Sequence, residues 1–247
     1  MKKATFLIIF LFICLQLLAE FDISKGNNAY QNQEYEKAKE YYEEFVQQEV
    51  KNFNLFYNLG NTYFKLENYG LARLFYEKAL RFRPLDKDLV FNLELLQARL
   101  KDKEENEESF LQHILRKIYY FFSVNLLAIF VLICFILIML TIVFLILSEK
   151  SSTKKVVKVF MFIISIFFMI FLILTILRLH EFYNENFAVI IDETVFAYSG
   201  PNSDFQQVFT IHEGLKVRIE KFDKDWVLIK LQSGNGGWVK NESLSVI

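Results

Sequence analysis

Two long stretches without a charged side chain constrain this chain more than any other feature. Leu126 to Leu147 contributes 22 consecutive uncharged residues, and Val159 to Leu177 contributes 19. As α-helices these stretches would extend roughly 33 and 28 Å, which is enough to cross the hydrocarbon core of a bilayer. A hydrophobic content of 53% agrees with a protein that is partly embedded in lipid. The sequence therefore predicts two transmembrane helices.

The segment between these stretches carries a cluster of positive charge. Lys150, Lys154, Lys155 and Lys158 lie within residues 149–158, which we expect to form a loop. Because basic loops remain on the cytoplasmic side, this loop is predicted to face the cytoplasm and both flanking regions to face outward. Neither stretch contains an acid, a base or a histidine. We therefore expect the two helices to be anchors rather than an ion or proton pathway.

The N-terminus has the pattern of an export signal. Lys2 and Lys3 precede a short apolar run, and Ala19 supplies a small residue at a cleavage position. An uncleaved anchor would orient the chain in the same way. Cys14 lies inside the run after Ile13, a context that does not favour lipidation.

An internal repeat follows the signal segment. Four residues recur 34 positions later: Gly26 as Gly60, Tyr35 as Tyr69, Ala38 as Ala72 and Tyr42 as Tyr76. This is the period of tetratricopeptide (TPR) repeats, in which helical hairpins stack on one another. The second copy resembles the TPR consensus at Phe56, Leu59, Gly60, Tyr63, Ala72, Tyr76, Ala79 and Pro84. Residues 91–93 repeat the pattern of residues 57–59, so residues 86–100 are predicted to form a capping helix.

The C-terminal region has the alternation of β-strands. Apolar Leu215, Val217 and Ile219 alternate with polar neighbours. Strands are predicted at residues 187–192, 194–198, 207–211, 215–222, 225–231 and 237–240, which is typical of a small barrel. The ordered set Tyr198-Ser199-Gly200-Pro201, Gly214, Asp225-Trp226-Val227 and Gly236-Gly237-Trp238-Val239 resembles the bacterial SH3 family.

The predicted fold class is a multidomain membrane protein with all-α TPR hairpin repeats, two transmembrane helices and a small all-β SH3-like barrel. The expected divisions are residues 1–19 (signal peptide or N-terminal anchor), 20–100 (TPR module), 101–120 (charged linker or helix), 121–148 (first transmembrane helix), 149–158 (cytoplasmic basic loop), 159–178 (second transmembrane helix) and 186–247 (SH3-like domain).

No motif of an enzyme or a metal protein is present in the sequence. It has no glycine-rich phosphate loop, nucleophile elbow or helical pair of metal ligands. Both cysteines lie in apolar runs, and the three histidines fall in three different regions. A formal net charge of −1 gives no reason to expect nucleic acid as a partner. We expect a non-enzymatic protein without a cofactor or a metal.

Binding surfaces remain as the candidates for function. TPR modules bind partner segments on the concave face made by the first helix of each repeat. Here that face would carry Asn27, Tyr30, Asn58, Asn61, Lys65 and Arg99. Three of these, Asn27, Asn58 and Arg99, are similar to part of a carboxylate clamp, but Ile23 and Leu95 replace its lysines. The alternative is that the amides are simply solvated.

The second candidate surface is aromatic. Tyr198, Trp226 and Trp238 would line a groove for a peptide or a cell-wall glycan, because aromatic rings provide stacking faces at low entropic cost. The alternative is that the tryptophans are core residues. We expect at least one tryptophan to be core and Tyr198 to be exposed.

The order of export signal, TPR repeats, two spans and SH3-like domain resembles the BatE family of the Bacteroides aerotolerance (Bat) group over essentially the whole chain. The resemblance implies a multi-pass protein of the bacterial inner membrane whose TPR and SH3-like domains face the periplasm. It also implies von Willebrand A-domain Bat proteins as partners, a MoxR-type AAA+ ATPase as an indirect partner, and a role in aerotolerance or stress survival.

Two functions of different classes are compatible with these features. The first is a scaffold, held by membrane lipid, that assembles partner proteins through the TPR groove. The second is a cell-wall receptor whose SH3-like domain binds peptidoglycan. The sequence does not decide between them.

Overall fold

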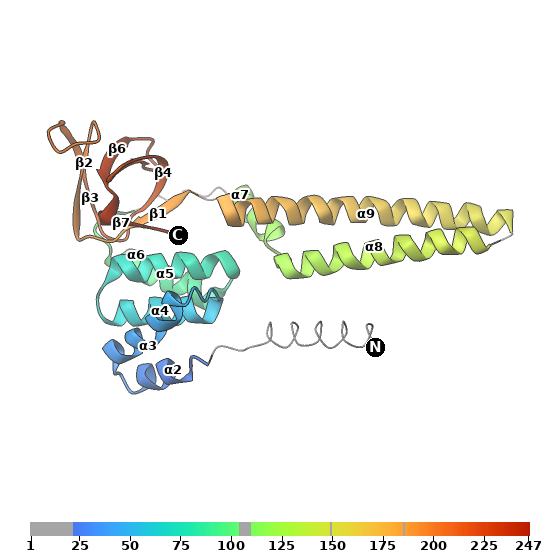
Figure 1. Cartoon of the computed structure of the whole chain (residues 1–247), viewed down its shortest axis with the longest axis horizontal. Helices are drawn as coiled ribbons and strands as arrows, with labels where there is room; N and C mark the ends of the chain where they lie inside the picture. Colours follow the sequence, from blue (N-terminus) through green and yellow to red (C-terminus); the bar gives the residue numbers. More distant parts are fainter. Residues whose placement is uncertain (1–21, 104–109, 149, 185) are drawn as a thin grey trace, which may run out of the picture.

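The computed structural model describes residues 22–103, 110–148, 150–184 and 186–247 (Figure 1). The export signal predicted at residues 1–19, including Cys14, lies outside the described residues. Figure 1 shows three parts: a stack of helical hairpins, a long two-helix hairpin and a β-sheet placed beside the helical stack.

The helical stack consists of five helices in the described residues. They are α2 (Ser24–Gln31), α3 (Tyr35–Gln47), α4 (Phe53–Lys65), α5 (Tyr69–Phe82) and α6 (Lys87–Arg99). Side-chain caps define three of the starts, because Asn52, Asn68 and Asp86 accept hydrogen bonds from the backbone N–H three residues later. Helix α6 lies 34 residues after α4 and confirms the predicted capping helix.

Glycine allows the two helices of each hairpin to approach closely. A Cβ at Gly60 would lie 2.5 Å from Cδ1 of Tyr76, and one at Gly26 would lie 2.4 Å from Cε1 of Tyr42. Both tyrosines are almost completely buried. The repeated glycine and tyrosine therefore form one packing unit in each hairpin.

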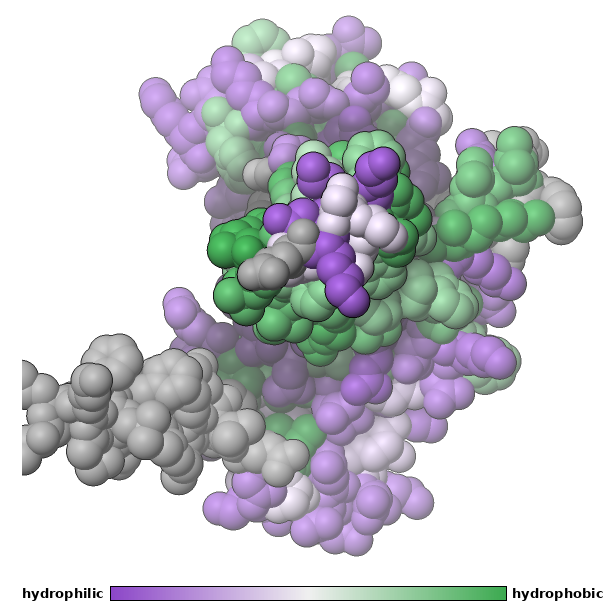
Figure 2. Space-filling view, turned by 90° about the vertical axis from the view of Figure 1, so that its right-hand side faces the viewer, coloured by the Kyte–Doolittle hydropathy of each residue, from purple (hydrophilic) through white to green (hydrophobic). Residues whose placement is uncertain are grey.

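The long hairpin is formed by α8 (Val124–Leu147) and α9 (Ser151–Asn184), which follow the short helix α7 (Phe110–Tyr119). Both long helices are long and apolar enough to cross a membrane. Figure 2 views the molecule from the far end of this hairpin, where apolar residues surround a polar tip and the two flanking parts are mostly hydrophilic.

The prediction of a basic loop at residues 149–158 was wrong in its secondary structure. Helix α9 begins at Ser151, so Lys154, Lys155 and Lys158 lie on its first turns. The reason is local: residues 85–199 contain neither glycine nor proline, and lysine is compatible with a helix. The basic cluster remains at the tip of the hairpin, but it is mainly helical.

The C-terminal part is a seven-stranded antiparallel sheet with strand order β3-β2-β6-β5-β4-β1-β7. Its strands are β1 (Phe187–Ile190), β2 (Thr194–Tyr198), β3 (Gln207–His212), β4 (Lys216–Asp223), β5 (Trp226–Lys230), β6 (Gly236–Lys240) and β7 (Leu244–Val246). The first six coincide with the predicted strands to within two residues. The sequence analysis missed β7 and the short 3₁₀ turn before it, η1 (Asn241–Ser243).

The expected barrel is not closed. The outer strands β3 and β7 lie at opposite ends of the sheet order and do not pair with each other. The β1–β7 edge instead packs against the helical stack, where Val189 and Ile247 belong to the same buried cluster as Leu59 and Leu96. Burial of apolar side chains on the helices thus takes the place of strand pairing at this edge.

All three parts meet at the end of α5. Arg81 Nη1 donates a hydrogen bond of 2.7 Å to the Ile247 carbonyl oxygen of the sheet. The guanidinium of Arg81 also lies 4.7 Å from the ring centre of Phe182, near the end of α9. Phe182 makes an edge-to-face contact with Phe82 at 5.5 Å. The helical stack is therefore in contact with both the sheet and the long hairpin.

Candidate functional site

The predicted asparagines form hydrogen-bonded links between successive hairpins. Asn27 Oδ1 accepts a hydrogen bond of 2.7 Å from the Tyr42 hydroxyl and one of 2.9 Å from Asn58 Nδ2. The partners come from α2, α3 and α4. Burial raises the pKa of Tyr42 to about 12, so its hydroxyl remains a donor at neutral pH.

The same arrangement occurs 34 residues later. Asn61 Oδ1 accepts from the Tyr76 hydroxyl at 2.7 Å and from Asn92 Nδ2 at 2.8 Å. These amides therefore hold one hairpin to the next, which neither the clamp nor the solvated alternative anticipated. The 34-residue recurrence of Asn27 as Asn61 and of Asn58 as Asn92 was the signal that could have predicted this role.

The other three predicted residues of the concave face are placed differently. Tyr30 is half-buried and contacts Tyr35 edge to face at 5.3 Å. Lys65 and Arg99 are exposed, and they occupy matching positions 34 residues apart at the ends of α4 and α6. These two cations are accessible to a partner.

The comparison with protein families identifies this repeat. Residues 53–85 match the family described as Tetratricopeptide repeat. This segment is a TPR repeat. It spans α4, α5 and the turn that contains Pro84. The comparison with curated proteins found no match for the chain.

The aromatic residues predicted for the second surface lie close together on the sheet. Tyr198 of β2 is in register with Trp238 of β6, and the Tyr198 ring meets Trp226 of β5 edge to face at 5.5 Å. All three side chains are half-buried. The expectation that at least one tryptophan is core was wrong, because the buried positions of these strands are the alternating Val227, Ile229 and Val239.

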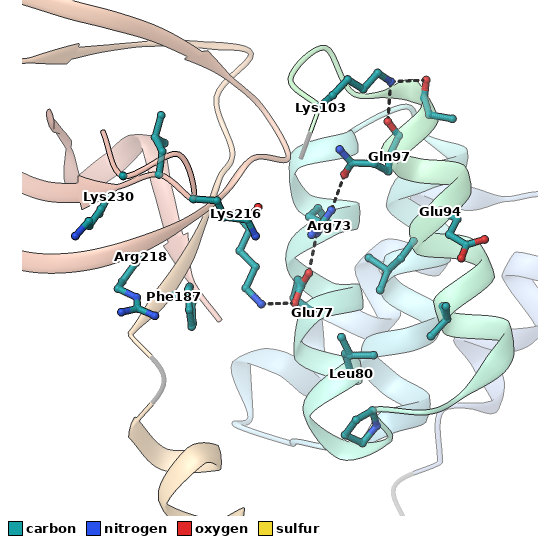
Figure 3. Close-up of a pocket in the computed structure, with 17 residues that line it drawn as sticks. Arg73, Glu77, Leu80, Glu94, Gln97, Lys103, Phe187, Lys216, Arg218 and Lys230 are labelled. Atoms are coloured by element: carbon teal, nitrogen blue, oxygen red, sulfur yellow. Dashed lines mark hydrogen bonds and ion pairs between the residues drawn. The ribbon is translucent and has the colours of Figure 1, made fainter. Parts of the chain in front are cut away.

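A cleft between the TPR helices and the sheet was not predicted from the sequence. It has a volume of about 960 Å³. Its helical wall comes from α5 and α6 and the segments that follow them, and its other wall comes from β1, β4, β5 and the turn after β5 (Figure 3). The charged lining residues are Arg73, Glu77, Glu94, Lys103, Lys216, Arg218 and Lys230. Basic side chains outnumber acidic ones by five to two.

A buried ion cluster forms the floor of this cleft. Glu77 is only 4% exposed and lies between Arg73 Nε at 2.8 Å and Lys216 Nζ at 2.9 Å. Arg73 also donates to Gln97 Oε1 at 2.9 Å, as Figure 3 shows. Burial alone would raise the pKa of Glu77, but the charges of Arg73 and Lys216 outweigh it and the pKa is lowered.

Further contacts hold the sheet against the helices beside the cleft. The Asp102 carboxylate accepts the His212 backbone N–H at 2.7 Å and lies 3.0 Å from His212 Nδ1. Glu213 accepts the backbone N–H of Gly70 at 2.8 Å. Leu100 packs over Gly214, where a Cβ would lie 2.4 Å from Leu100 Cδ2. Sequence reasoning missed these pairs because their partners are more than 100 positions apart.

The histidine in these contacts acts as a structural group. Within the described ranges, no three His, Cys, Asp or Glu side chains are grouped in a way that could hold a metal ion. The chemistry available at the described surfaces is therefore that of hydrogen bonding, charge and aromatic stacking.

Proposed function

We propose that this protein is a non-enzymatic, membrane-anchored scaffold that binds partner proteins through its TPR module. The observation that carries the proposal is the TPR match at residues 53–85, since TPR helices in general present surfaces for partner segments. The exposed cations Lys65 and Arg99 at matching positions of α4 and α6 support an interaction with an acidic partner segment.

The membrane attachment is part of the same proposal. Helices α8 and α9 are the anchors, and the lysines at the tip of their hairpin favour a cytoplasmic tip. The TPR module and the sheet would then face the periplasm of a bacterium. The resemblance to the BatE family suggests von Willebrand A-domain Bat proteins as partners, a MoxR-type ATPase as an indirect partner, and a role in aerotolerance.

A second candidate function rests on a different observation. The half-buried cluster of Tyr198, Trp226 and Trp238 resembles the aromatic surfaces that stack on sugars. If the sheet is an open relative of bacterial SH3 domains, these rings would bind peptidoglycan. The protein would then be a cell-wall receptor.

The test of the scaffold function uses the full-length chain. Deleting the TPR module would expose the sheet, because Val189 and Ile247 are buried in the helical core. We therefore propose the double charge reversal Lys65→Glu and Arg99→Glu, with Lys221→Glu and Lys240→Glu on exposed sheet positions as the matched control. Each tagged protein is solubilised gently from its native membrane, and co-purifying proteins are identified by mass spectrometry.

The expected result is recovery of A-domain membrane proteins with the wild-type and the control, and loss of these proteins with the TPR variant. Recovery of no protein partner with the wild-type would contradict the scaffold function. Recovery of cell-wall fragments in their place would favour the receptor.

A further inference from the structure

The 34-residue repeat shows what the helical wall of the cleft would face in a longer TPR array. In the TPR repeat, Phe56, Leu59, Gly60 and Tyr63 of α4 are buried, and α5 supplies Phe75 and Tyr76 against them. The equivalent positions in α6 are Val90, Leu93, Glu94 and Gln97. All four of these residues line the cleft. The cleft therefore lies where the second helix of a third repeat would pack.

The α6 positions differ from their α4 equivalents in a consistent direction. Phe56 is 6% exposed, whereas Val90 at the equivalent position is 37% exposed. Gly60, which contacts Tyr76, is replaced by the exposed Glu94. A closely packed helix of the same chain would meet the Glu94 carboxylate, and burying that charge would be costly. The site is thus open and suited to an occupant that is held less tightly.

The helix-to-helix link that accompanies this packing is retained. In the first interface the Tyr63 hydroxyl donates to the Glu43 carboxylate. At the equivalent positions of the second interface, Arg73 donates to both Glu77 and Gln97. This holds α6 on α5 and keeps its open face directed at the cleft.

The opposite wall supplies positive charge. Arg218 and Lys230 are exposed on β4 and β5, and Figure 3 shows them on the sheet side of the cleft. Lys216 lies deeper, where it pairs with Glu77. The apolar lining is Leu80, Pro84, Val90, Leu93, Phe187 and Leu231. An occupant that matches both walls has one apolar face and one acidic face.

We propose that this cleft binds a short, acidic, amphipathic helix of a partner protein, in the position of the missing second helix of the third TPR repeat. The apolar face of that helix packs on α5 and α6, and its acidic face meets Arg218 and Lys230. This proposal rests on the scaffold function and assigns it a second binding site, separate from Lys65 and Arg99.

The experiment uses full-length protein in phosphatidylcholine nanodiscs and a fluorescent peptide of about 16 residues, which is roughly four helical turns. The peptide has leucine at helical spacing and glutamate at the other positions. A second peptide with lysine in place of glutamate tests charge preference. The cleft variant is Arg218→Glu with Lys230→Glu, and the control is Lys221→Glu with Lys240→Glu, which applies the same charge change outside the cleft.

The expected result is that the acidic peptide binds the wild-type and the control equally and binds the cleft variant about tenfold more weakly, as reversal of two partly exposed charges predicts. Binding should also weaken as salt is added. Equal binding of the acidic and basic peptides, or an equal loss in the control, would overturn the proposal. So would a nanodisc mass showing that a second copy of the chain occupies the cleft.

The co-purification described for the scaffold function separates the two proposals. If A-domain proteins are recovered with the cleft variant as well as with the wild-type, and the acidic peptide ignores the cleft, the scaffold function stands and the cleft proposal fails. If the wild-type recovers no protein partner, the scaffold function fails whatever the peptide does.

Discussion

Lys216 Nζ on β4 lies 2.9 Å from Glu77 Oε2 on α5, although the two residues are 139 positions apart in the sequence. Glu77 is almost completely buried, and Arg73 pairs with its other carboxylate oxygen. The sheet therefore contributes one of the two cations that neutralise a carboxylate inside the helical stack. This ion pair makes the stability of the TPR module depend on the sheet.

Replacing Glu77 by glutamine should strongly destabilise the contact between helices and sheet. The substitution leaves the charges of Arg73 and Lys216 in a buried site without a counter-charge, at a cost of about 3–5 kcal/mol. Chemical denaturation of detergent-solubilised protein, followed by tryptophan fluorescence, measures the loss. Glu242→Gln is the control, since its pair with Lys240 is exposed and should contribute about 0–1 kcal/mol. Equal losses in the two variants would contradict this assignment.

The same residue predicts a dependence of stability on acid. The folded-state pKa of Glu77 is lowered, so its contribution is complete above the unfolded-state pKa, near the model value of 4.5, and is lost as the pH falls through the lower folded-state value. The difference in unfolding free energy between wild-type and Glu77→Gln should therefore shrink below about pH 4.5. A difference that stayed constant down to pH 3 would show that Glu77 is not a source of acid sensitivity.

Replacing Gly60 by valine should loosen the TPR hairpin. The added side chain would collide with the Tyr76 ring, and overpacking of this kind costs about 1–3 kcal/mol. Hydrogen–deuterium exchange of α4 and α5 should speed up accordingly. Asn54→Val on the exposed side of the same helix should change exchange little. A smaller ring site, as in Gly60→Val with Tyr76→Leu, should recover part of the loss; no recovery would place the strain elsewhere.

The aromatic cluster predicts the outcome of a glycan-binding assay. If the receptor function holds, full-length protein in nanodiscs sediments with purified peptidoglycan, and Tyr198→Ala with Trp238→Ala reduces the bound fraction, because each stacked ring contributes roughly 0.5–1.5 kcal/mol. Phe222→Ala removes an exposed aromatic ring elsewhere on the sheet and should have no effect. Unchanged sedimentation of the double variant would exclude the cluster as the binding surface.

The proposed orientation can be tested by cysteine labelling. In a chain whose two native cysteines are replaced by serine, Lys155→Cys marks the tip of the α8–α9 hairpin and Ser203→Cys marks an exposed turn of the sheet. A membrane-impermeant maleimide applied to spheroplasts should label position 203 and should label position 155 only after lysis. Labelling of position 155 in intact spheroplasts would reverse the proposed topology.

Much of the local structure could be read from the sequence because it depends on neighbouring residues. The charge-free runs predicted α8 and α9, and the 34-residue period predicted the hairpins and the capping helix. Strand alternation placed β1 to β6. The basic segment was misjudged, since a charge cluster indicates the side of a membrane without indicating a break in a helix.

Long-range structure decided the candidate site. The sequence located Asn27 and Asn58 on one face, but only the stacking of hairpins made them partners of each other and of Tyr42. The cleft follows from the docking of an open sheet edge on α5, through Val189, Ile247 and Lys216. By itself the sequence determined the helices, the strands and the repeat, since these follow from local periodicity and residue spacing. Tertiary structure alone decided the open sheet, the buried ion cluster and the cleft, because burial and pairing between distant residues set their free energies.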